Sequence, residues 1–238
     1  MNKELFMKGA AALSLPIDET CLERLMTYSE LLKAWNQKIN LTAITDDDGI
    51  AVKHFLDSVL LLKYIDIKSG VPLADIGTGG GFPGLPLKIL RSDISLTLID
   101  SQNKRINFLN AVKDELSLRG VNCVHGRAEE LSRKSIYRET FDVVTSRAVA
   151  NMTALSEYCL PFAAVGGVFV AFKSESAEKE ILDSRAIIGT LGGKLADIIK
   201  APLPESGITR IFAVVEKIRH TPEWFPRAAK KIKSRRFV

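Results

Sequence analysis

A glycine-dense turn directly after a short apolar strand is the feature that most constrains this fold. The run Leu73-Ala-Asp-Ile-Gly-Thr-Gly-Gly-Gly-Phe-Pro-Gly84 begins inside a predicted strand at 71–76 and leads into a predicted helix at about 84–91. Such a turn lets the backbone approach a ligand closely, and it aims free N–H groups at that ligand. The sequence therefore predicts a ligand site at the carboxyl end of this strand.

Two acids near the turn indicate the kind of ligand. Asp75 precedes the first glycine, Gly77, by two residues, and Asp100 ends the next predicted strand. A carboxylate at that second position can accept hydrogen bonds from both hydroxyls of a ribose. The pair favours a nucleoside cofactor, with S-adenosylmethionine as the best candidate. The residues expected to bind it here are Asp75, Gly77, Thr78, Gly79, Gly81, Phe82, Asp100 and Ser101.

Other ligands of glycine-rich turns fit less well. The pattern G-x-G-x-x-G occurs at Gly79, Gly81 and Gly84, but it also marks nicotinamide and flavin sites. Here the turn opens earlier, at Gly77, and Phe82 stands where the third glycine of a dinucleotide site would fall. A Walker A loop is excluded because no Gly-Lys-Ser/Thr follows. A dinucleotide site and a turn that only packs a helix on a strand remain the alternatives.

A second candidate segment, Gly126-Arg-Ala-Glu129, follows the third predicted strand. A backbone N–H and a carboxylate there can recognise the edge of an adenine. Glu129 fits equally well as a first-turn acid that a helix dipole favours. The spacing leaves both interpretations open.

Strands and helices alternate from Val71 onward. Strands are predicted at 71–76, 95–99, 121–125, 141–146, 166–172, 194–199 and 209–216, and helices at about 84–91, 102–118, 151–159 and 175–189. Alternation of this kind indicates a mainly parallel, doubly wound α/β sheet. No crossover helix fits between the last two strands, so the seventh strand is expected to be antiparallel. This seven-stranded pattern is similar to the Rossmann-like sheet of class I methyltransferases.

The two ends of the chain differ from this core. Residues 1–70 are predicted to be helical, with helices over Lys3 to Leu13, from Asp18 to about Lys38, and after Asp48. Residues 217–238 hold eight Lys or Arg and one acid, so this tail carries +7 in a chain whose net charge is +5. We therefore expect an N-terminal helical extension (1–70), a core (71–216) and a basic tail (217–238).

The basic tail predicts contact with nucleic acid, because cations that neutralise phosphates gain affinity through counterion release. A solvated basic end is the alternative, and Trp224 and Phe225 either stack on a base or anchor the tail to the core. The cations expected to contact RNA are Arg227, Lys230, Lys231, Lys233, Arg235 and Arg236. No apolar run approaches the length of a membrane span and no signal peptide is evident, so a cytoplasmic protein without a membrane partner is expected. The three cysteines match no metal spacing, and no metal site is expected.

Taken together, these motifs resemble the glucose-inhibited division protein B family, the methyltransferases that act on a guanine N7 in bacterial small-subunit ribosomal RNA. The resemblance covers nearly the whole chain. It is carried by the glycine run and by Asn40-Leu-Thr-Ala-Ile44, His54-Phe-Leu-Asp57-Ser58, Asp100-Ser-Gln-Asn-Lys104-Arg105, Gly126-Arg-Ala-Glu129, Ser146-Arg-Ala-Val-Ala150, Ala171-Phe-Lys173 and Phe225-Pro226-Arg227. The tail departs from the family pattern, since the family often carries a proline after the basic residues and this chain ends Lys233-Ser-Arg-Arg-Phe-Val.

The resemblance implies roles for particular residues. It implies a methyl-donor site at Gly77, Phe82, Ala128, Glu129 and Arg147, and it implies that Arg147 and Lys173 face the methyl-transfer pocket as the catalytic pair. Asn40 and His54 match family positions that face the substrate. A hydrogen bond between His54 and Asp57 is the alternative for the histidine, and a turn at the end of a helix is the alternative for Asn40. The implied substrate is 16S ribosomal RNA, presented naked, in the small subunit or in an assembly intermediate. A monomer is expected.

The chemistry of that reaction needs little from the protein. Guanine N7 has a free lone pair and no proton to lose, so no general base is required, and the site must hold N7 and the methyl carbon close and aligned. Arg147 and Lys173 are expected to contact O6 of the guanine or a phosphate and to orient the base or the cofactor. For the arginine, O6 alone is favoured over a fork to O6 and N7, because N7 must stay free for attack. Two other functions remain open on the residues alone. They are a methyltransferase for a small molecule and a nucleotide- or RNA-binding regulator without catalysis.

Overall fold

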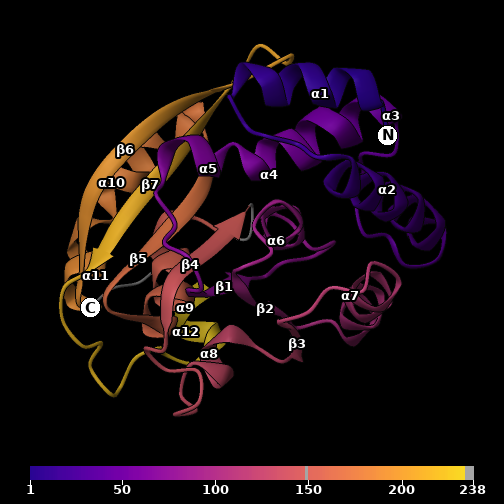
Figure 1. The fold of residues 1–238 in the computed structure, drawn as a ribbon. Helices are drawn as coiled ribbons and strands as arrows, with labels where there is room; N and C mark the ends of the chain where they lie inside the picture. The colour runs from indigo at the N-terminus through magenta and orange to yellow at the C-terminus, as the bar shows by residue number, and fades with distance from the viewer. Residues whose placement is uncertain (148–149, 234–238) are drawn as a thin grey trace.

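A single sheet of seven strands organises the structure, a computed structural model that describes residues 1–147 and 150–233. The strand order is β3-β2-β1-β4-β5-β7-β6, and β7 runs antiparallel to both of its neighbours while the first five strands are parallel. The predicted Rossmann-like sheet with an antiparallel last strand is confirmed (Figure 1). The strands are β1 (Pro72–Ile76), β2 (Ser95–Asp100), β3 (Val121–His125), β4 (Phe141–Arg147), β5 (Ala163–Ser174), β6 (Gly193–Leu203) and β7 (Ile208–Lys217).

Both faces of the sheet are covered, because successive strand residues point to opposite sides and apolar residues face both sides of the central strands. In β1, Leu73 belongs to one buried cluster and Ala74 to the other, and Val143 and Val144 of β4 divide in the same way. The first face carries the N-terminal helices with α6 (Gly84–Leu90) and α7 (Asn103–Glu115). The second carries α8 (Ala128–Leu131), α9 (Met152–Cys159), η2 (Leu160–Phe162), α10 (Glu178–Asp183) and α11 (Arg185–Thr190).

One predicted helix is interrupted. The segment expected as a single helix at 175–189 forms a short 3-10 turn η3 (Glu175–Ala177), then α10 and α11. The break falls at Ser184, whose hydroxyl donates to the Glu180 carbonyl at 2.8 Å and whose ψ of 0° leaves the helical range. A serine that bonds the preceding turn competes with the helix ladder, and this competition accounts for the break.

The N-terminal extension begins with two helices that the sequence predicts. They are α1 (Lys3–Ala12) and α2 (Glu19–Ile39), and Asp18 caps α2 by accepting from the Cys21 N–H at 2.6 Å. The next helix starts one residue before Asp48, so the expectation that Asp48 precedes it is wrong. Asp46 is the cap, because its carboxylate accepts from the Gly49 N–H at 2.7 Å.

The following segment is helical, but not in the regular way that its apolar spacing predicts. After α3 (Asp47–Gly49) the chain forms a π-helix, η1 (Ile50–Leu56), and then continues as α4 (Asp57–Val59) and α5 (Leu61–Tyr64). π-Helical turns are rare and concentrate at functional sites. None of the described helices has the length and apolar character that crossing a membrane requires.

The N-terminal helices are seated on the glycine turn. Tyr28 of α2 is fully buried, and its hydroxyl donates to the carbonyl of Gly80. Its ring stacks on Phe82 with 5.4 Å between centroids and lies 5.3 Å from the ring of Phe55 in η1. Aromatic pairs at these distances bury large apolar areas and add about 0.5–1.5 kcal/mol each beyond the burial itself. The turn, α2 and η1 therefore form one packed unit.

This packing predicts that Gly81→Ala is strongly destabilising. Gly81 has a φ of +96°, and a Cβ there would lie 2.5 Å from the Tyr28 hydroxyl and 2.6 Å from Leu85 Cδ1. Gly70 is the matched control, because its φ is +74° and a Cβ there would meet nothing within 4 Å. Urea unfolding should show a loss of about 1–2 kcal/mol for Gly70→Ala, from the backbone alone, and at least about 2 kcal/mol more for Gly81→Ala. Equal losses would show that Tyr28 and Leu85 move aside.

Candidate active site

Two cavities adjoin at the carboxyl ends of β1, β2 and β4, where the sequence predicts a ligand site. The first has a volume of about 440 Å³ and the second about 380 Å³, both within the range of small-molecule sites. Gly77, Asp100 and Ser101 line both of them, so the cavities meet at these residues. The first is otherwise lined by Ile76, Ile99, Gly126, Arg127, Ala128, Glu129, Ala150, Asn151, Ala154 and Tyr158, and the second by Leu41, Thr42, His54, Thr78, Gly79, Gly80, Phe82, Arg105 and Arg147.

Asp75 shapes the glycine turn from beneath. Its Oδ2 accepts from the Thr78 hydroxyl at 2.7 Å and from the Gly84 N–H at 2.9 Å, so one carboxylate oxygen holds both ends of the turn. Within the described residues, Oδ1 has no hydrogen-bond partner. Burial raises the pKa of Asp75 to about 6. Asp75 lines neither cavity, and Gly81 is likewise committed to packing against Tyr28 and Leu85.

Asp100 joins the turn to the end of β2. The carboxylate is 2 % exposed and accepts from the Gly79 N–H at 3.0 Å, the Gln102 N–H at 2.8 Å and Arg105 Nη1 at 3.2 Å. Two ionised oxygens offer about four acceptor sites, so capacity for a ligand remains. Asp100 lines both cavities and is thus the natural acceptor for hydroxyls placed where they meet.

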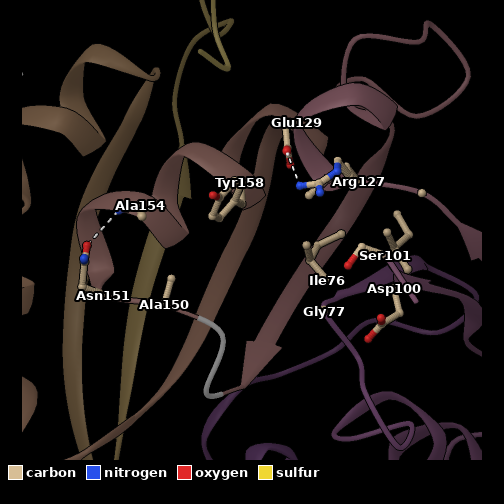
Figure 2. A pocket seen from close by; sticks show the side chains of 13 residues that line it. Ile76, Gly77, Asp100, Ser101, Arg127, Glu129, Ala150, Asn151, Ala154 and Tyr158 are labelled. Atoms are coloured by element: carbon tan, nitrogen blue, oxygen red, sulfur yellow. Dashed lines mark hydrogen bonds and ion pairs between the residues drawn. The ribbon is translucent and has the colours of Figure 1, made fainter. Parts of the chain in front are cut away.

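The residues present fit an adenosine-type ligand. The Gly79 backbone has a φ of +61°, and a Cβ there would meet nothing within 4 Å, so the turn leaves open space beside the second cavity. Figure 2 shows Tyr158, Ile76, Ser101 and Asp100 disposed around the first cavity, with Glu129 and Arg127 at one end. Apolar walls suit a purine ring, while two carboxylates and backbone N–H groups suit its polar edge and a ribose.

Arg147 reaches the second cavity from the end of β4, but it is not free to move there. Its Nη1 donates to the Asp57 carboxylate at 2.8 Å and to the Lys53 carbonyl at 3.1 Å, and its Nη2 lies 3.1 Å from His54 Nδ1. The guanidinium carbon also lies 5.0 Å from the centroid of the Phe82 ring, within cation–π range. All three acceptors come from η1 and the start of α4, so the N-terminal extension holds the guanidinium in place.

Asp57 is shared between two arginines. It is fully buried, and its Oδ1 accepts from Arg210 Nε of β7 at 2.7 Å while Oδ2 accepts from Arg147. A buried carboxylate of this kind would be costly without such partners. It ties η1 and α4 to two strands of the sheet at once. Arg210 carries no sequence motif that would have indicated this contact.

His54 does not bond Asp57, so that alternative is wrong. Its ring stacks on Phe82 at 4.4 Å between centroids, and its Nε2 lies 2.8 Å from the Thr42 hydroxyl. Burial, and next the nearby charge of Arg147, lowers the pKa of His54 to about 3. The imidazole is therefore neutral at physiological pH.

Lys173 and Asn40, two of the expected site residues, line neither cavity. Lys173 Nζ donates to the Ala150 carbonyl at 2.7 Å and to the Glu180 carboxylate at 2.8 Å. It thus secures the segment that brings Ala150 and Asn151 to the first cavity. Asn40 ends α2 in the left-handed conformation, with φ 48° and its side chain exposed, and Thr42 two residues later is the one that lines the second cavity.

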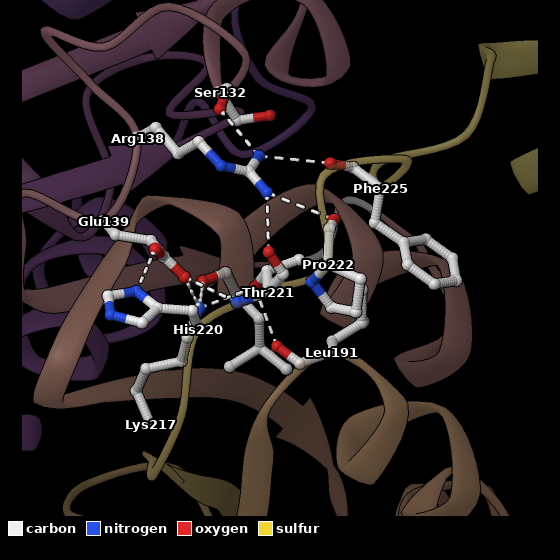
Figure 3. Close-up of polar contacts among 10 residues, drawn as sticks. Ser132, Arg138, Glu139, Leu191, Lys217, His220, Thr221, Pro222 and Phe225 are labelled. Carbon is white, nitrogen blue, oxygen red and sulfur yellow. Dashed lines mark hydrogen bonds and ion pairs between the residues drawn. The ribbon is translucent and has the colours of Figure 1, made fainter.

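The C-terminal segment after β7 packs against the second face of the sheet and is held there by hydrogen bonds (Figure 3). Arg138 donates to the carbonyls of Thr221, Pro222 and Phe225 at 2.9, 3.2 and 3.1 Å. Phe225 is buried, so it anchors the segment. Trp224 is 70 % exposed and is available for stacking.

The tail cations have different surroundings. Arg227 donates through its backbone N–H, Nε and Nη2 to the fully buried Glu157 of α9, at 2.6 to 3.1 Å, so this arginine anchors the chain. Lys230 and Lys231 lie exposed on α12 (Ala229–Lys233), and Lys230 borders a third cavity of about 490 Å³ that also includes Arg127 and Glu129. The backbone of Lys233 ends α12, and Arg235 and Arg236 lie outside the described residues.

Comparison with known proteins gives the family. Residues 21–203 match the family described as rRNA small subunit methyltransferase G, or GidB. Proteins named ribosomal RNA small subunit methyltransferase G are 46 % identical over 95 % of both chains in Clostridium perfringens and 47 % identical over 91 % of both chains in Clostridium kluyveri. The chain belongs to this family.

Solved structures agree on the fold. An S-adenosylmethionine-dependent methyltransferase from Aquifex aeolicus superposes with a TM-score of 0.53 at 15 % identity, covering 78 % of this chain and 97 % of its own. A putative methyltransferase complexed with the activator Trm112 from Haloferax volcanii gives 0.57 at 14 % identity, over 79 % and 98 %. At such low identity the likeness establishes the class I methyltransferase fold alone.

Several residues that line the cavities are not predicted from the sequence, for reasons that the structure makes clear. Thr42 lies inside the Asn40-Leu-Thr-Ala-Ile44 block, so a signal existed but pointed to its neighbour. Tyr158 and Ala154 belong to α9, whose apolar spacing indicates only a packed helix. Arg105 follows Asp100 by five residues, and only the turn into α7 brings its guanidinium back to that carboxylate.

The neutral His54 predicts a pH-dependent stability. Its folded pKa of about 3 lies below the unfolded value of 6.5, so the unfolded chain binds the extra proton as pH falls. Stability from this group is complete above pH 6.5 and is lost as pH falls toward 3. In urea unfolding between pH 4.5 and 7, the advantage of the wild type over His54→Asn should shrink on acidification, by up to about 1.4 kcal/mol per pH unit. Parallel pH curves for the two proteins would contradict this.

Proposed function

We propose that this chain transfers a methyl group from S-adenosylmethionine to N7 of a guanine in bacterial 16S ribosomal RNA. Membership of the rRNA small subunit methyltransferase G family supports the substrate class. The observation that carries the proposal is the pair of adjoining cavities that share Gly77, Asp100 and Ser101. A nucleoside donor would occupy the first cavity, and an acceptor base would enter the second cavity beside it.

Residues of the first cavity would hold the donor. Asp100 accepts hydrogen bonds from ribose hydroxyls, and the segment from Gly126 to Glu129 contacts the adenine edge. Gly77 and Gly79 line the cavities without a side chain, while their N–H groups donate to the Ile99 carbonyl and to Asp100. Ser101, Thr78 and Phe82 complete the lining. When bound, S-adenosylmethionine supplies an electrophilic methyl carbon.

The reaction requires no general base. In the second cavity His54 is neutral and its ring nitrogens are directed at Arg147 and Thr42, and the Arg147 guanidinium can only donate hydrogen bonds. The chain's contribution is therefore to orient the base and to exclude water. Lys173 acts indirectly, through the segment it secures beside Ala150.

The RNA is expected to approach across the exposed basic and aromatic groups of the C-terminal segment. Lys230 and Trp224 are exposed there, and basic side chains with an aromatic ring are what single-stranded RNA binds. The target guanine must be splayed out of its stack to enter the second cavity. We propose that the chain acts in the cytoplasm as a monomer, on the small subunit or an assembly intermediate.

The first test is a methylation assay. The pure protein is incubated with methyl-labelled S-adenosylmethionine and small ribosomal subunits that lack their native N7-methylguanosine, and any label is mapped on the RNA. We expect label at one guanine N7, with a rate that falls as salt rises. Label that is independent of RNA would indicate a small-molecule methyltransferase. RNA binding without label on subunits, naked RNA or assembly intermediates would indicate a binding protein.

The donor site has its own test in Asp100→Asn. Replacing one acceptor oxygen with an amide puts a donor opposite the Gly79 N–H or the ribose hydroxyls, and such losses cost about 1.5–3 kcal/mol for a charged partner. Calorimetry should therefore show S-adenosylmethionine affinity falling at least tenfold. Asp142→Asn, an exposed position on β4, is the matched control and should bind normally. An unchanged affinity in Asp100→Asn would remove Asp100 from the donor site.

A further inference from the structure

Thr42 lines the second cavity and has no part in the proposed function. It lies in the loop between α2 and α3, and the Asn36 side chain fixes its backbone there. Asn36 Oδ1 accepts from the N–H groups of Leu41 and Thr42 at 2.6 and 2.8 Å, and Asn36 Nδ2 donates to the Thr42 carbonyl at 2.9 Å. The Thr42 hydroxyl thus has a defined position at the cavity wall.

A chain of hydrogen bonds fixes the direction of each proton up to that hydroxyl. The Arg147 guanidinium can only donate, so His54 Nδ1 at 3.1 Å from Nη2 must accept. The neutral imidazole then carries its proton on Nε2, which donates to Thr42 Oγ1 at 2.8 Å. The Ile44 N–H also donates to Oγ1, at 3.0 Å. Both lone pairs of the hydroxyl are therefore occupied.

The hydroxyl hydrogen is what remains. Nowhere in the described chain does an acceptor for it lie within hydrogen-bonding distance, and Thr42 borders the second cavity. Arg147 similarly uses three of its five N–H groups on Lys53, Asp57 and His54. The wall around Thr42 and Arg147 consequently offers donors, and it calls for a ligand atom that accepts.

The base edge that carries N7 supplies such an atom. Guanine presents N7 and O6 there, both acceptors, whereas adenine presents N7 beside an amino donor. N7 must stay free to attack the methyl carbon, which leaves O6. We propose that the Thr42 hydroxyl, oriented by His54, donates a hydrogen bond to O6 of the target guanine and excludes adenine. This inference rests on the proposed function.

The test combines protein variants with altered RNA substrates, as in a double-mutant cycle. Wild type, Thr42→Val and Thr42→Ser are assayed on subunits reconstituted with RNA that carries either guanine or 2-aminopurine at the mapped position. 2-Aminopurine keeps N7 but lacks O6. On the guanine RNA, kcat/KM should fall about tenfold for Thr42→Val and less than about threefold for Thr42→Ser, which keeps the hydroxyl. On the 2-aminopurine RNA, wild type and Thr42→Val should agree within about threefold.

Other outcomes would overturn the proposal in separable ways. Equal losses on both RNAs for Thr42→Val would mean that the threonine only supports Ile44 and His54. A weakened affinity for S-adenosylmethionine in that variant, measured by calorimetry, would place the hydroxyl at the donor instead. A wild type that methylates neither RNA would overturn the proposed function itself. Thr42→Ala is assayed against the same criteria if Thr42→Val does not fold.

Discussion

The contact on which the candidate site depends is the binding of the Arg147 guanidinium by the short helical segment from Lys53 to Asp57. Arg147 stands at the end of a core strand, yet its hydrogen-bond acceptors at Lys53, His54 and Asp57 all belong to the N-terminal extension. The segment is π-helical up to Leu56 and α-helical from Asp57, and π-helical turns are frequent at functional sites. The extension is thereby part of the candidate active site.

Electrostatics explain why this capture is stable. Asp57 is fully buried, and alone it would be very costly, but two arginines from β4 and β7 surround it. Burial, and next the charge of Arg147, lower the pKa of His54 to about 3, so the imidazole carries no charge and fixes the direction of its two hydrogen bonds. The wall of the second cavity is thus held by hydrogen bonds within the protein, and such preorganisation is what the proposed displacement at carbon needs.

The sheet and the glycine turn were predictable because local patterns determine them. The sequence shows the apolar strands, the clustered glycines and the acids at two strand ends, and these patterns can be interpreted without knowledge of distant contacts. The break at Ser184 depends on a competing side-chain bond, and the contact of Arg210 with Asp57 joins residues 153 positions apart in the sequence. The region predicted for the site coincides with the two cavities. Asn40 was favoured over Thr42 because the motif could not indicate which side chain faces the cavity.

The attachment of the C-terminal segment to α9 has a thermodynamic consequence. Glu157 and Tyr158 are consecutive on α9, and the first holds Arg227 while the second lines the cavity that fits an adenosine. One turn of helix thus touches both the basic end of the chain and the first cavity. If RNA bound to that end changes the binding free energy of the donor through α9, then the bound donor changes the binding free energy of the RNA by the same amount. Measuring either affinity with and without the other ligand would give that coupling energy directly.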